Sequence, residues 1–416
     1  MHCATAQPCS PGNIWLGITS DWLTPSNWCS GGVPTSTTDV IIPTGTPIQP
    51  IINAGGAVCR SITISTGETL TINGNNTLSV FGDWTNHGTL VANNSTVSFA
   101  ANTAITQTVT GNTSFFNISK PNSNSTLSFG SSITTIGNNL SVSAGSMSGG
   151  TATIIFTGSS ASLQGSSTKD FYNLEISSGA VLTQTAGTNI NVNNSYKNNG
   201  TFIQTNSRTI TFQTISQTLS GTGKSTFGNV TVSGAISLNA GTHDFSVLGT
   251  FNISGGSGMF NGANATTIFS GATAALGSGP GTFNFNNITI TGVLSNPSGK
   301  NFSIAGNWLN NGSYTAGNET ITFTGSSQTI GGSASTVFNH LSIAGTADKT
   351  LGNDITVNNI LTLLSRNIDA NANSKTVYVK GTVARSTIGH IVGNLKKDIP
   401  SGTSITKLFE VGTLNY

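Results

Sequence analysis

Carboxylates are the first residues to consider for chemistry, because hydrolysis needs a paired acid and base and metal binding needs clustered oxygens. The 416-residue sequence has thirteen, and they do not recur at equivalent positions of the repeat described below. Asp170 and Glu175 are close in sequence, but Asp170 precedes a phenylalanine at a turn and Glu175 points outward from its strand. A solvated pair is the better interpretation. The thirteen are Asp21, Asp39, Glu68, Asp83, Asp170, Glu175, Asp244, Glu319, Asp348, Asp354, Asp369, Asp398 and Glu410.

Histidine offers a second route to acid–base chemistry. His243 and Asp244 adjoin in the segment GTHDF and could act as a base and the carboxylate that orients it, but neighbours on a strand face opposite ways. His87 and His340 stand where equivalent phrases carry asparagine, which indicates turn residues. The glycine-rich segment 277–281 is followed by neither a lysine nor a helix, so it is a loop and not a phosphate site. We therefore predict no catalytic, cofactor-binding or metal-binding residue and no cofactor.

All four cysteines lie within the first 59 residues, at Cys3, Cys9, Cys29 and Cys59. An even number confined to one end of the chain favours two disulfides formed in an oxidising compartment, with three possible pairings. Free thiols and a metal site stay open as alternatives, although the chain has no CxxC pair. Cys59 occupies a position that faces the core in later repeats, so we expect it to join Cys29.

The composition excludes several classes of partner. Only 7% of the residues are charged and the formal net charge is +2, which argues against a nucleic-acid partner. No apolar run reaches the roughly 18 residues of a membrane span, and no signal peptide is visible. Seven of the fifteen basic residues lie between Arg366 and Lys407, where a solvated surface explains them. The hydrophobic residues are strongly patterned, which favours a folded chain over a disordered one.

Similar phrases recur along the chain. One set of equivalent phrases is GDWTNHGTL at 82–90, NSYKNNGTF at 194–202 and GNWLNNGSY at 306–314. Two further sets consist of phrases similar to FYNLEI at 171–176 and to QTVTG at 107–111. Equivalent positions are separated by 53 to 58 residues, mostly by 56, which gives about five copies. The rings that recur at these positions are expected to form the core: Trp84, Tyr196, Phe251, Trp308, Phe115, Phe171, Phe227, Phe285 and Phe338.

Each copy consists of short strands separated by turns. Segments such as TITF at 209–212 alternate β-branched or aromatic residues with polar ones, and Gly, Asn and Ser clusters interrupt them. No long window keeps the 3.6-residue spacing of a helix. One copy cannot enclose a core alone, so the copies must stack. The sequence predicts an all-β parallel β-helix, or β-solenoid, of about five 56-residue repeats with an N-terminal cap.

The number of coils in each repeat is open, since two coils of about 28 residues and three of about 19 both fit. In either case equivalent side chains are expected to stack on successive coils. Phe171 and Phe227 would share one row of core rings, and Asn173, Asn229 and Asn287 would form an amide ladder beside a turn. A β-propeller is the competing fold; it is less favoured because the copies vary in length and hold about six strands rather than four.

We expect three regions along the chain. Residues 1–57 form a cap, rich in Trp, Cys and Pro, that covers the first exposed strand edge. Residues 58–364 form the solenoid repeats. Residues 365–416 form the last coil and the start of a following β-rich module. Because that pattern breaks off at Tyr416, we expect the natural polypeptide to be longer.

The segment 15–43 carries a set of short motifs, namely Trp15-x-Gly17, Asp21-Trp22, Asn27-Trp28, Gly32 to Pro34 and Asp39 to Pro43, and G-x-W-x-N-x-G phrases follow it. In these motifs the chain resembles the N-terminal part of large, repeat-rich, adhesin-like surface and secreted proteins of the Bacteroidota, exported by the type IX secretion system. Residues 378–416 resemble the link into a further module of such proteins. The motifs specify architecture rather than activity. The resemblance implies an extracellular or cell-surface location and contact with the secretion machinery.

These features favour a non-enzymatic extracellular stalk or adhesin for attachment or display, with a polysaccharide or an abiotic surface as its partner. One alternative is a self-assembling filament or surface-layer subunit, whose partner is another copy of the chain. Another is the carrier region of a larger secreted polysaccharide-active enzyme. Membrane insertion is not expected. Ice binding by rows of T-x-T pairs, as at Thr209-x-Thr211 and Thr320-x-Thr322, is disfavoured because the equivalent segments of other repeats lack the second threonine.

Overall fold

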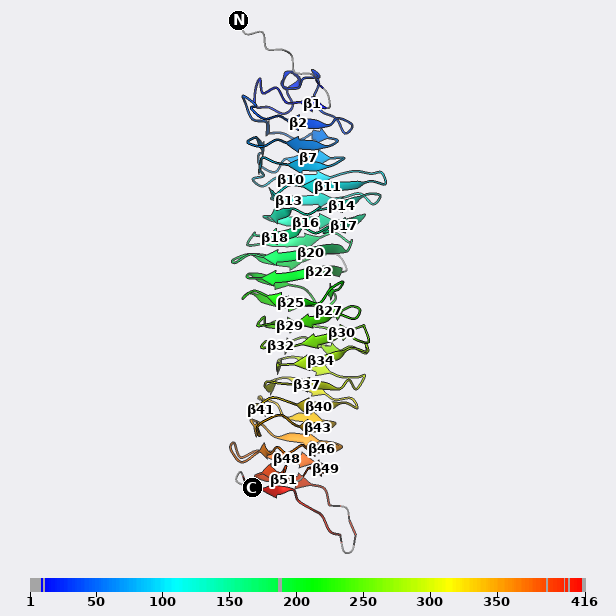
Figure 1. The fold of residues 1–416 in the computed structure, drawn as a ribbon, viewed down its shortest axis with the longest axis vertical. Coiled ribbons are helices and arrows are strands. Elements are labelled where there is room, and N and C mark those ends of the chain that lie inside the picture. The colour runs from blue at the N-terminus through cyan, green and yellow to red at the C-terminus, as the bar shows by residue number, and fades with distance from the viewer. Residues whose placement is uncertain are drawn as a thin grey trace. The chain divides into compact units, whose positions relative to one another are not determined.

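The computed structural model describes residue 9 and residues 12–185, 189–386, 388–399, 401–402 and 405–413. These residues divide into two compact units, unit 1 up to Gln204 and unit 2 from Thr205 onward. In each unit short strands stack in successive turns (Figure 1). Among the described residues the one helical element is the 3₁₀ turn η1 (Pro25–Asn27), and none forms a helix long and apolar enough to cross a bilayer.

In unit 1 the chain winds through three parallel ladders of strands and returns to the first ladder once per turn. The first ladder is β4 (Ala57–Cys59), β7 (Thr77–Val80), β10 (Thr96–Phe99), β13 (Asn117–Lys120), β16 (Asn139–Val142), β19 (Ala161–Gln164), β21 (Val181–Gln184) and β23 (Thr201–Ile203). The second is β1 (Asn13–Ile14), β2 (Val40–Ile42), β5 (Ile62–Ile64), β8 (Trp84–Asn86), β11 (Thr106–Thr110), β14 (Thr126–Ser128) and β17 (Ser146–Ser148).

The third ladder of unit 1 begins with β3 (Ile51–Ile52), β6 (Thr69–Ile72) and β9 (Thr89–Val91), and continues with β12 (Thr113–Phe115), β15 (Ile133–Ile136) and β18 (Thr153–Phe156). Two longer strands follow, β20 (Lys169–Ile176) and β22 (Asn189–Asn198). Their pairing shifts register between Phe171 and Asn173, so each strand turns a corner. The first half of β20 therefore extends the second ladder beside β17, and its second half extends the third.

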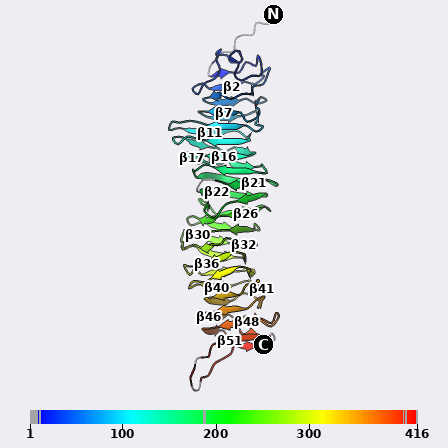
Figure 2. The same ribbon diagram turned by 180° about the vertical axis from the view of Figure 1, so that it is seen from behind.

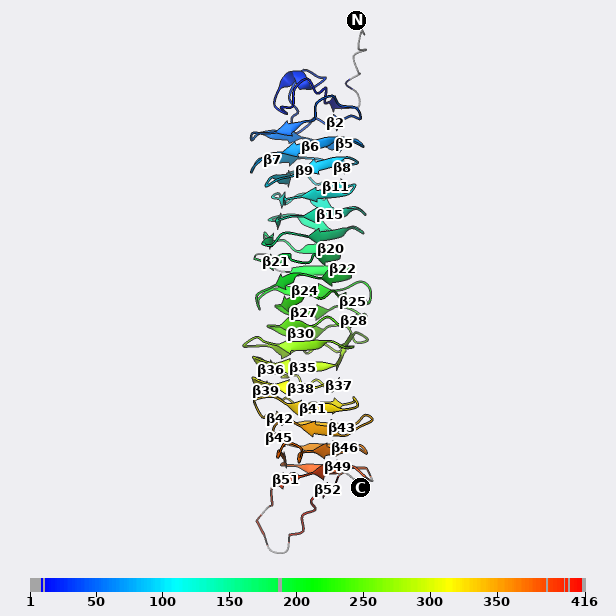
Figure 3. The ribbon, with the colours of Figure 1, turned by 90° about the vertical axis from the view of Figure 1, so that its left-hand side faces the viewer.

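Unit 2 has the same three-ladder plan (Figures 2 and 3). Its first ladder is β26 (Lys224–Phe227), β29 (Phe245–Val247), β32 (Thr266–Phe269), β35 (Asn287–Ile290), β38 (Trp308–Asn310), β41 (Gln328–Gly331), β44 (Lys349–Leu351), β47 (Ile368–Asp369), β50 (Ile391–Val392) and β52 (Val411–Gly412).

The second ladder of unit 2 is β24 (Thr209–Phe212), β27 (Asn229–Val232), β30 (Thr250–Ile253), β33 (Ala275–Leu276), β36 (Val293–Ser295) and β39 (Ser313–Thr315), then β42 (Thr336–Phe338), β45 (Ile355–Val357), β48 (Thr376–Val379) and β51 (Asn394–Lys397). The third is β25 (Gln217–Ser220), β28 (Ser237–Asn239), β31 (Met259–Asn261), β34 (Thr282–Phe285), β37 (Phe302–Ile304), β40 (Thr320–Phe323), β43 (His340–Ile343), β46 (Ile360–Leu363) and β49 (Thr382–Arg385).

Strand residues alternate between buried apolar and outward polar side chains. In β7 (TLSV) and β10 (TVSF) the apolar residues are buried, while the threonines and serines face outward. Because successive side chains of a strand point to opposite faces, this period of two gives every strand one core side and one solvent side. The core rings expected from the repeat are all buried, with at most 2% of each exposed.

One turn of the solenoid takes about 21 residues, and the described residues make about 17 turns. Partners on neighbouring turns, such as Thr113 with Thr134 and Ile118 with Leu140, show the same spacing. The predicted parallel β-solenoid is confirmed. Both predicted coil lengths, 28 and 19 residues, are wrong, because the 56-residue sequence repeat is not a whole number of turns.

The 56-residue repeat instead contains eight strands, counting β20 and β22 twice because each spans two ladders, whereas a turn contains three. Each copy therefore ends one strand short of three turns, and the next copy begins on another ladder. In unit 1, Cys59 lies on the first ladder, Phe115 on the third and Phe171 on the second. In unit 2 the order recurs with Phe227, Phe285 and Phe338.

Equivalent residues of the repeat consequently do not stack on one another. The predicted row of Phe171 and Phe227 is wrong, since the register partner of Phe171 is Val192 and that of Phe227 is Val247. The predicted amide ladder has the wrong members for the same reason: Asn173 accepts hydrogen bonds from Asn194 and Ser195, Asn229 from the Thr250 N–H, and Asn287 from the Asn307 N–H. An asparagine ladder does form, at a spacing of one turn, from Asn53, Asn73 and Asn93.

Residues 12–56 gather three tryptophans at the start of unit 1. The rings of Trp15 and Trp22 each pack edge-on against Trp28, with centroids 4.9 and 4.8 Å apart. The Trp15 indole N–H donates to the Ile48 carbonyl at 2.7 Å, and that of Trp28 donates to the Trp22 carbonyl at 2.8 Å. The segment joins the second ladder through β1 and β2. Its role as a cap stays a prediction.

The cysteines do not pair as expected. Cys9 and Cys29 form a disulfide with their Cα atoms 5.6 Å apart. Cys59 is a buried free thiol on β4. The expected bond between Cys29 and Cys59 is therefore wrong, because Cys29 has another partner. Cys3 lies outside the described residues.

Cys59 is expected to resist alkylation in the folded protein. Burial raises the pKa of its thiol, and the thiolate is the form that reacts. Intact-mass spectrometry after iodoacetamide treatment should show no label on Cys59 in native buffer and full labelling in denaturant. As a control, Cys9 and Cys29 should react once they are reduced. Fast labelling of Cys59 in native buffer would show that the first turns of unit 1 open readily.

Candidate functional site

The most regular polar cluster in unit 1 is built by two of the repeated phrases, 82–88 and 107–111, which lie on neighbouring turns. Trp84 is fully buried, and its indole N–H donates to Thr113 Oγ1 at 3.1 Å. Asn86 Nδ2 donates to the same Thr113 oxygen at 3.1 Å. One threonine hydroxyl thus ties together two residues of the preceding turn.

Gln107 completes this cluster from the other phrase. Its Nε2 donates to the carbonyls of Val80, at 2.9 Å, and Gly82, at 3.0 Å. Gly111 packs directly on the Asn86 carbonyl with φ of +85°, so any β-carbon there would overlap that oxygen. We call Trp84, Asn86, Gln107, Gly111 and Thr113 the inter-turn clamp of unit 1.

Unit 2 holds a second clamp with the same chemistry. The Trp308 indole N–H donates to Thr336 Oγ1 at 3.0 Å, and Asn310 Nδ2 donates to it at 3.2 Å. Gln328 Nε2 donates to the carbonyls of Ile304, at 2.9 Å, and Gly306. The phrases recur together because they are bonding partners on neighbouring turns. The chemistry that the two copies share is hydrogen bonding between neighbouring turns.

Aspartates at the turns also bond one turn of the solenoid to the next. Five of them accept an N–H from the next turn: Asp39 from Ser61, Asp83 from Thr108, Asp244 from Thr266, Asp348 from Asn367 and Asp354 from Thr376. Glu175 forms an outward ion pair with Lys197 at 2.9 Å, whereas Asp170 bonds Asn191. In the described part of the chain, no three His, Cys, Asp or Glu side chains lie close enough together to hold a metal ion.

His243 is bonded to a hydroxyl in a way that resembles a nucleophile and its base. Its Nε2 lies 2.8 Å from Ser225 Oγ, and its Nδ1 lies 2.9 Å from the Gly221 carbonyl. Both side chains are buried, His243 with 1% and Ser225 with 3% exposed, and burial lowers the pKa of His243. Asp244, the carboxylate that adjoins His243 in sequence, accepts the Thr266 N–H and does not contact the imidazole through any hydrogen bond shown among the described residues. The Ser225–His243 pair is a buried hydrogen-bonded contact between neighbouring turns.

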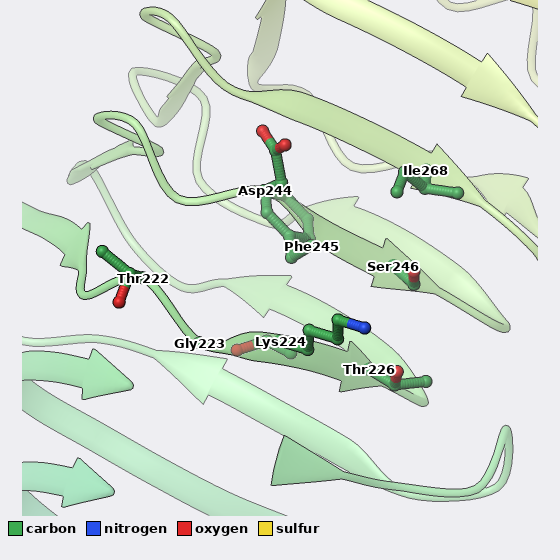
Figure 4. A pocket seen from close by; sticks show the side chains of 9 residues that line it. Thr222, Gly223, Lys224, Thr226, Asp244, Phe245, Ser246 and Ile268 are labelled. Atoms are coloured by element: carbon green, nitrogen blue, oxygen red, sulfur yellow. The ribbon is translucent and has the colours of Figure 1, made fainter. Parts of the chain in front are cut away.

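A surface hollow of about 360 Å³ lies over this contact on the first ladder of unit 2. Lys224, Thr226, Asp244 and Ser246 surround it (Figure 4). His87 is exposed; His340 begins strand β43 and so is not the turn residue that was predicted. Residues 277–281 form a loop, as predicted.

Three buried lysines are among the polar residues that sequence analysis missed. Lys120, Lys169 and Lys349 are fully buried, and each ammonium donates to backbone carbonyls. Lys349 Nζ bonds the carbonyls of Gly325 at 2.7 Å, Ser326 at 2.9 Å and Ala347 at 2.7 Å, which join two turns. The alternation of the sequence could have predicted the burial of Lys349, because this lysine stands at an inward position of the segment KTL.

Lys349 should make the stability of unit 2 depend on pH. Burial lowers the pKa of its ammonium from 10.5 to about 8. Between these values the unfolded chain binds a proton that the folded chain has lost, so the free energy of unfolding should rise with pH, by up to about 1.4 kcal/mol per unit. Below about pH 8 both states are protonated and this contribution is constant.

Denaturant unfolding of the full chain between pH 7 and 10.5 measures this effect as a difference from Lys349→Met, which lacks the titrating group. The parent should gain stability over the variant as the pH rises. Lys380→Met, at an exposed lysine of the same unit, is the matched control and should follow the parent. Parallel pH curves for the parent and Lys349→Met would contradict the prediction.

The outward faces carry two shallow grooves lined by hydroxyl and amide side chains. On the third ladder of unit 2, a groove of about 320 Å³ runs over β34, β37 and β40. On the first ladder of unit 1, a groove of about 310 Å³ is lined by Thr96, Asn117, Ile118, Ser119, Asn139, Ser141 and Gln164. No charged side chain lines either groove. The two T-x-T pairs do not form one row, because Thr209-x-Thr211 lies on the second ladder and Thr320-x-Thr322 on the third.

Comparison with known proteins adds one match. Residues 14–144, from β1 through the first turns of unit 1, match the model of a family described as Domain of unknown function (DUF8693). No curated protein and no solved structure matches the chain. The matched segment includes the tryptophan cluster and the clamp of unit 1. The chain is thus similar to this family over less than half of its length, and the match assigns no activity.

Proposed function

We propose that this chain is a non-enzymatic, extracellular stalk or adhesin that attaches to neutral polysaccharide or abiotic surfaces. The observation that carries the proposal is the outward lattice of uncharged hydroxyl and amide groups, held on the rungs of parallel ladders and hollowed into two grooves. Such groups both donate and accept hydrogen bonds, as sugar hydroxyls do. The Cys9–Cys29 disulfide supports an oxidising, extracellular location.

A non-enzymatic role is supported by where the reactive side chains lie. The aspartates named above hold neighbouring turns together, and the Ser225–His243 pair is buried under the surface. The rings are also mostly inside, so attachment relies on many weak hydrogen bonds rather than on stacking. Weak contacts repeated along a ladder add up through multivalency.

Retention of residues 1–416 on insoluble polysaccharides, at low and high salt, tests the proposal. We expect retention on at least one neutral polymer, with little change between 0.05 and 1 M salt (about a 20-fold range), because charge contributes little to contacts between uncharged groups. Retention that salt abolishes would identify a charge-driven binder. No retention on any polymer or abiotic surface would overturn the adhesin.

A second candidate, self-assembly into filaments or a surface layer, is supported by the last strands of unit 2. Large apolar side chains are exposed on or near β51 and β52: Val411 (50%) lies on β52, and Ile399 (63%) and Leu408 (62%) lie in the segment between the two strands. Exposed apolar groups next to strand edges favour association. Electron microscopy of the purified chain separates the two candidates, because long fibres favour assembly and isolated particles favour the adhesin.

A further inference from the structure

The groove of unit 2 has the regular geometry of a binding surface. Its outward side chains form two rows across three consecutive strands of the third ladder, and register pairs Asn284 with Ser303 and Ser303 with Thr322. Neighbouring strands are about 4.8 Å apart, so each row presents a polar group at that interval. The rows are Thr282, Asn301 and Thr320, and Asn284, Ser303 and Thr322.

Bonds within the rows hold the asparagines in fixed orientations. Ser303 Oγ donates to Asn284 Oδ1 at 2.7 Å, and the Thr320 N–H donates to Asn301 Oδ1 at 2.7 Å. The asparagine side chains are therefore oriented before any ligand arrives, which lowers the entropy cost of binding. Among the described residues, the structure shows no hydrogen bond for the hydroxyls of Thr282, Thr320 and Thr322. These hydroxyls are free to bond a ligand.

The groove also defines the chemistry of its ligand. It contains no charge, so it offers an acidic or basic polymer no ion pair. Its two rings, Phe283 and Phe302, are only 1% and 5% exposed, so hydrogen bonding rather than stacking must provide recognition. A shallow surface that repeats along three strands suits an extended chain better than a compact small molecule, which needs enclosure.

We propose that this groove binds one extended chain of a neutral polysaccharide, laid across β34, β37 and β40 with its hydroxyls against successive rungs. The inference rests on the proposed function and names the surface that performs it. Thr320 and Thr322 donate and accept hydrogen bonds on β40. On β37 the Ser303 oxygen accepts, because its O–H is already donated to Asn284, and on β34 the Asn284 amide supplies a further polar group. Binding at a single groove is weak, and a polymer surface strengthens it by engaging many copies of the protein.

The test compares two double variants of the full chain on the neutral polymer that retains the parent best. Thr320→Val with Thr322→Val removes two groove hydroxyls while keeping the shape and strand preference of the side chains. Thr211→Val with Thr231→Val makes the same change at outward, paired threonines on the second ladder of unit 2, and is the matched control. We expect the groove variant to bind about 10-fold more weakly and the control to stay within about twofold of the parent.

Each outcome decides something different. Equal binding by both variants and the parent overturns the groove and leaves the proposed function standing. Equal loss in both variants also overturns it, because binding would then follow the total hydroxyl surface. A parent that binds no neutral polymer overturns the proposed function itself. Ser303→Trp, which fills the groove, is a second variant whose full retention would likewise contradict the site; hydrogen exchange of every variant confirms that it folds.

Discussion

Trp308→Ala is expected to lower the free energy of unfolding of unit 2 by about 3–5 kcal/mol, the cost of deleting a buried tryptophan side chain. The ring is fully buried, and its centroid lies 4.9 Å from that of Tyr314 and 5.5 Å from that of Phe338. The substitution leaves a cavity between neighbouring turns and removes the hydrogen bond to Thr336. Both the packing and the hydrogen bond belong to the clamp of unit 2. The loss of stability should therefore be greatest in the turns that contain β38 and β42.

Hydrogen exchange of the full chain, followed by mass spectrometry, measures the loss of stability in Trp308→Ala at each strand. Amides of β38 and β42 should exchange about 100-fold faster or more in the variant. Leu309→Ala, on the same strand with an outward side chain, is the control and should change the exchange little. Unchanged exchange in Trp308→Ala would show that the clamp contributes nothing to stability.

Gly111→Ala should destabilise unit 1 by about 3 kcal/mol or more. The backbone of Gly111 has φ of +85°, and an added β-carbon would overlap the Asn86 carbonyl oxygen of the preceding turn. The Asn86 carbonyl belongs to β8, which pairs with β5, and the Gly111 N–H donates to Ser132 Oγ at 2.7 Å. Moving either residue to make room for the β-carbon would disturb these bonds.

Gly67→Ala is the matched control. Gly67 has the same φ of +85°, but no atom lies within 4 Å of the added β-carbon. Its cost should be only that of the left-handed backbone, about 1–2 kcal/mol. Denaturant unfolding of the full chains, read by fluorescence and hydrogen exchange, separates the two effects. Equal losses in the two variants would show that contact between turns at Gly111 is not tight.

The sequence was sufficient to predict the parts of the fold that depend on local alternation. The period of two places rings such as Trp84 and Phe251 inside, and the turn residues between strands mark where the chain bends. Stacking in parallel follows because no single copy can enclose a core. These predictions need no knowledge of distant partners.

The turn length and the polar partners could not be predicted in the same way. A sequence repeat identifies the segment that recurs. The length of that segment need not be a multiple of the length of one turn. Asn86 reaches Thr113 and Gln107 reaches Gly82, pairs separated by 27 and 25 residues. Such spacings become visible only when the 21-residue turn is known. The grooves were missed for the same reason, since their rows follow the turn and not the repeat.

The eight-strand copy also bears on how such a chain can evolve. Duplicating a segment carries each side chain to a different face in each of three successive copies, so copying alone cannot lengthen a strip of ligand-binding groups along one face. Thr282, Asn301 and Thr320 stand at unrelated positions of the copied segment, 19 residues apart. In the proposed binding surface, each of them would therefore have to arise separately. The core tolerates duplication because all three faces need the same apolar residues inside, whereas a one-sided surface has to be acquired one substitution at a time.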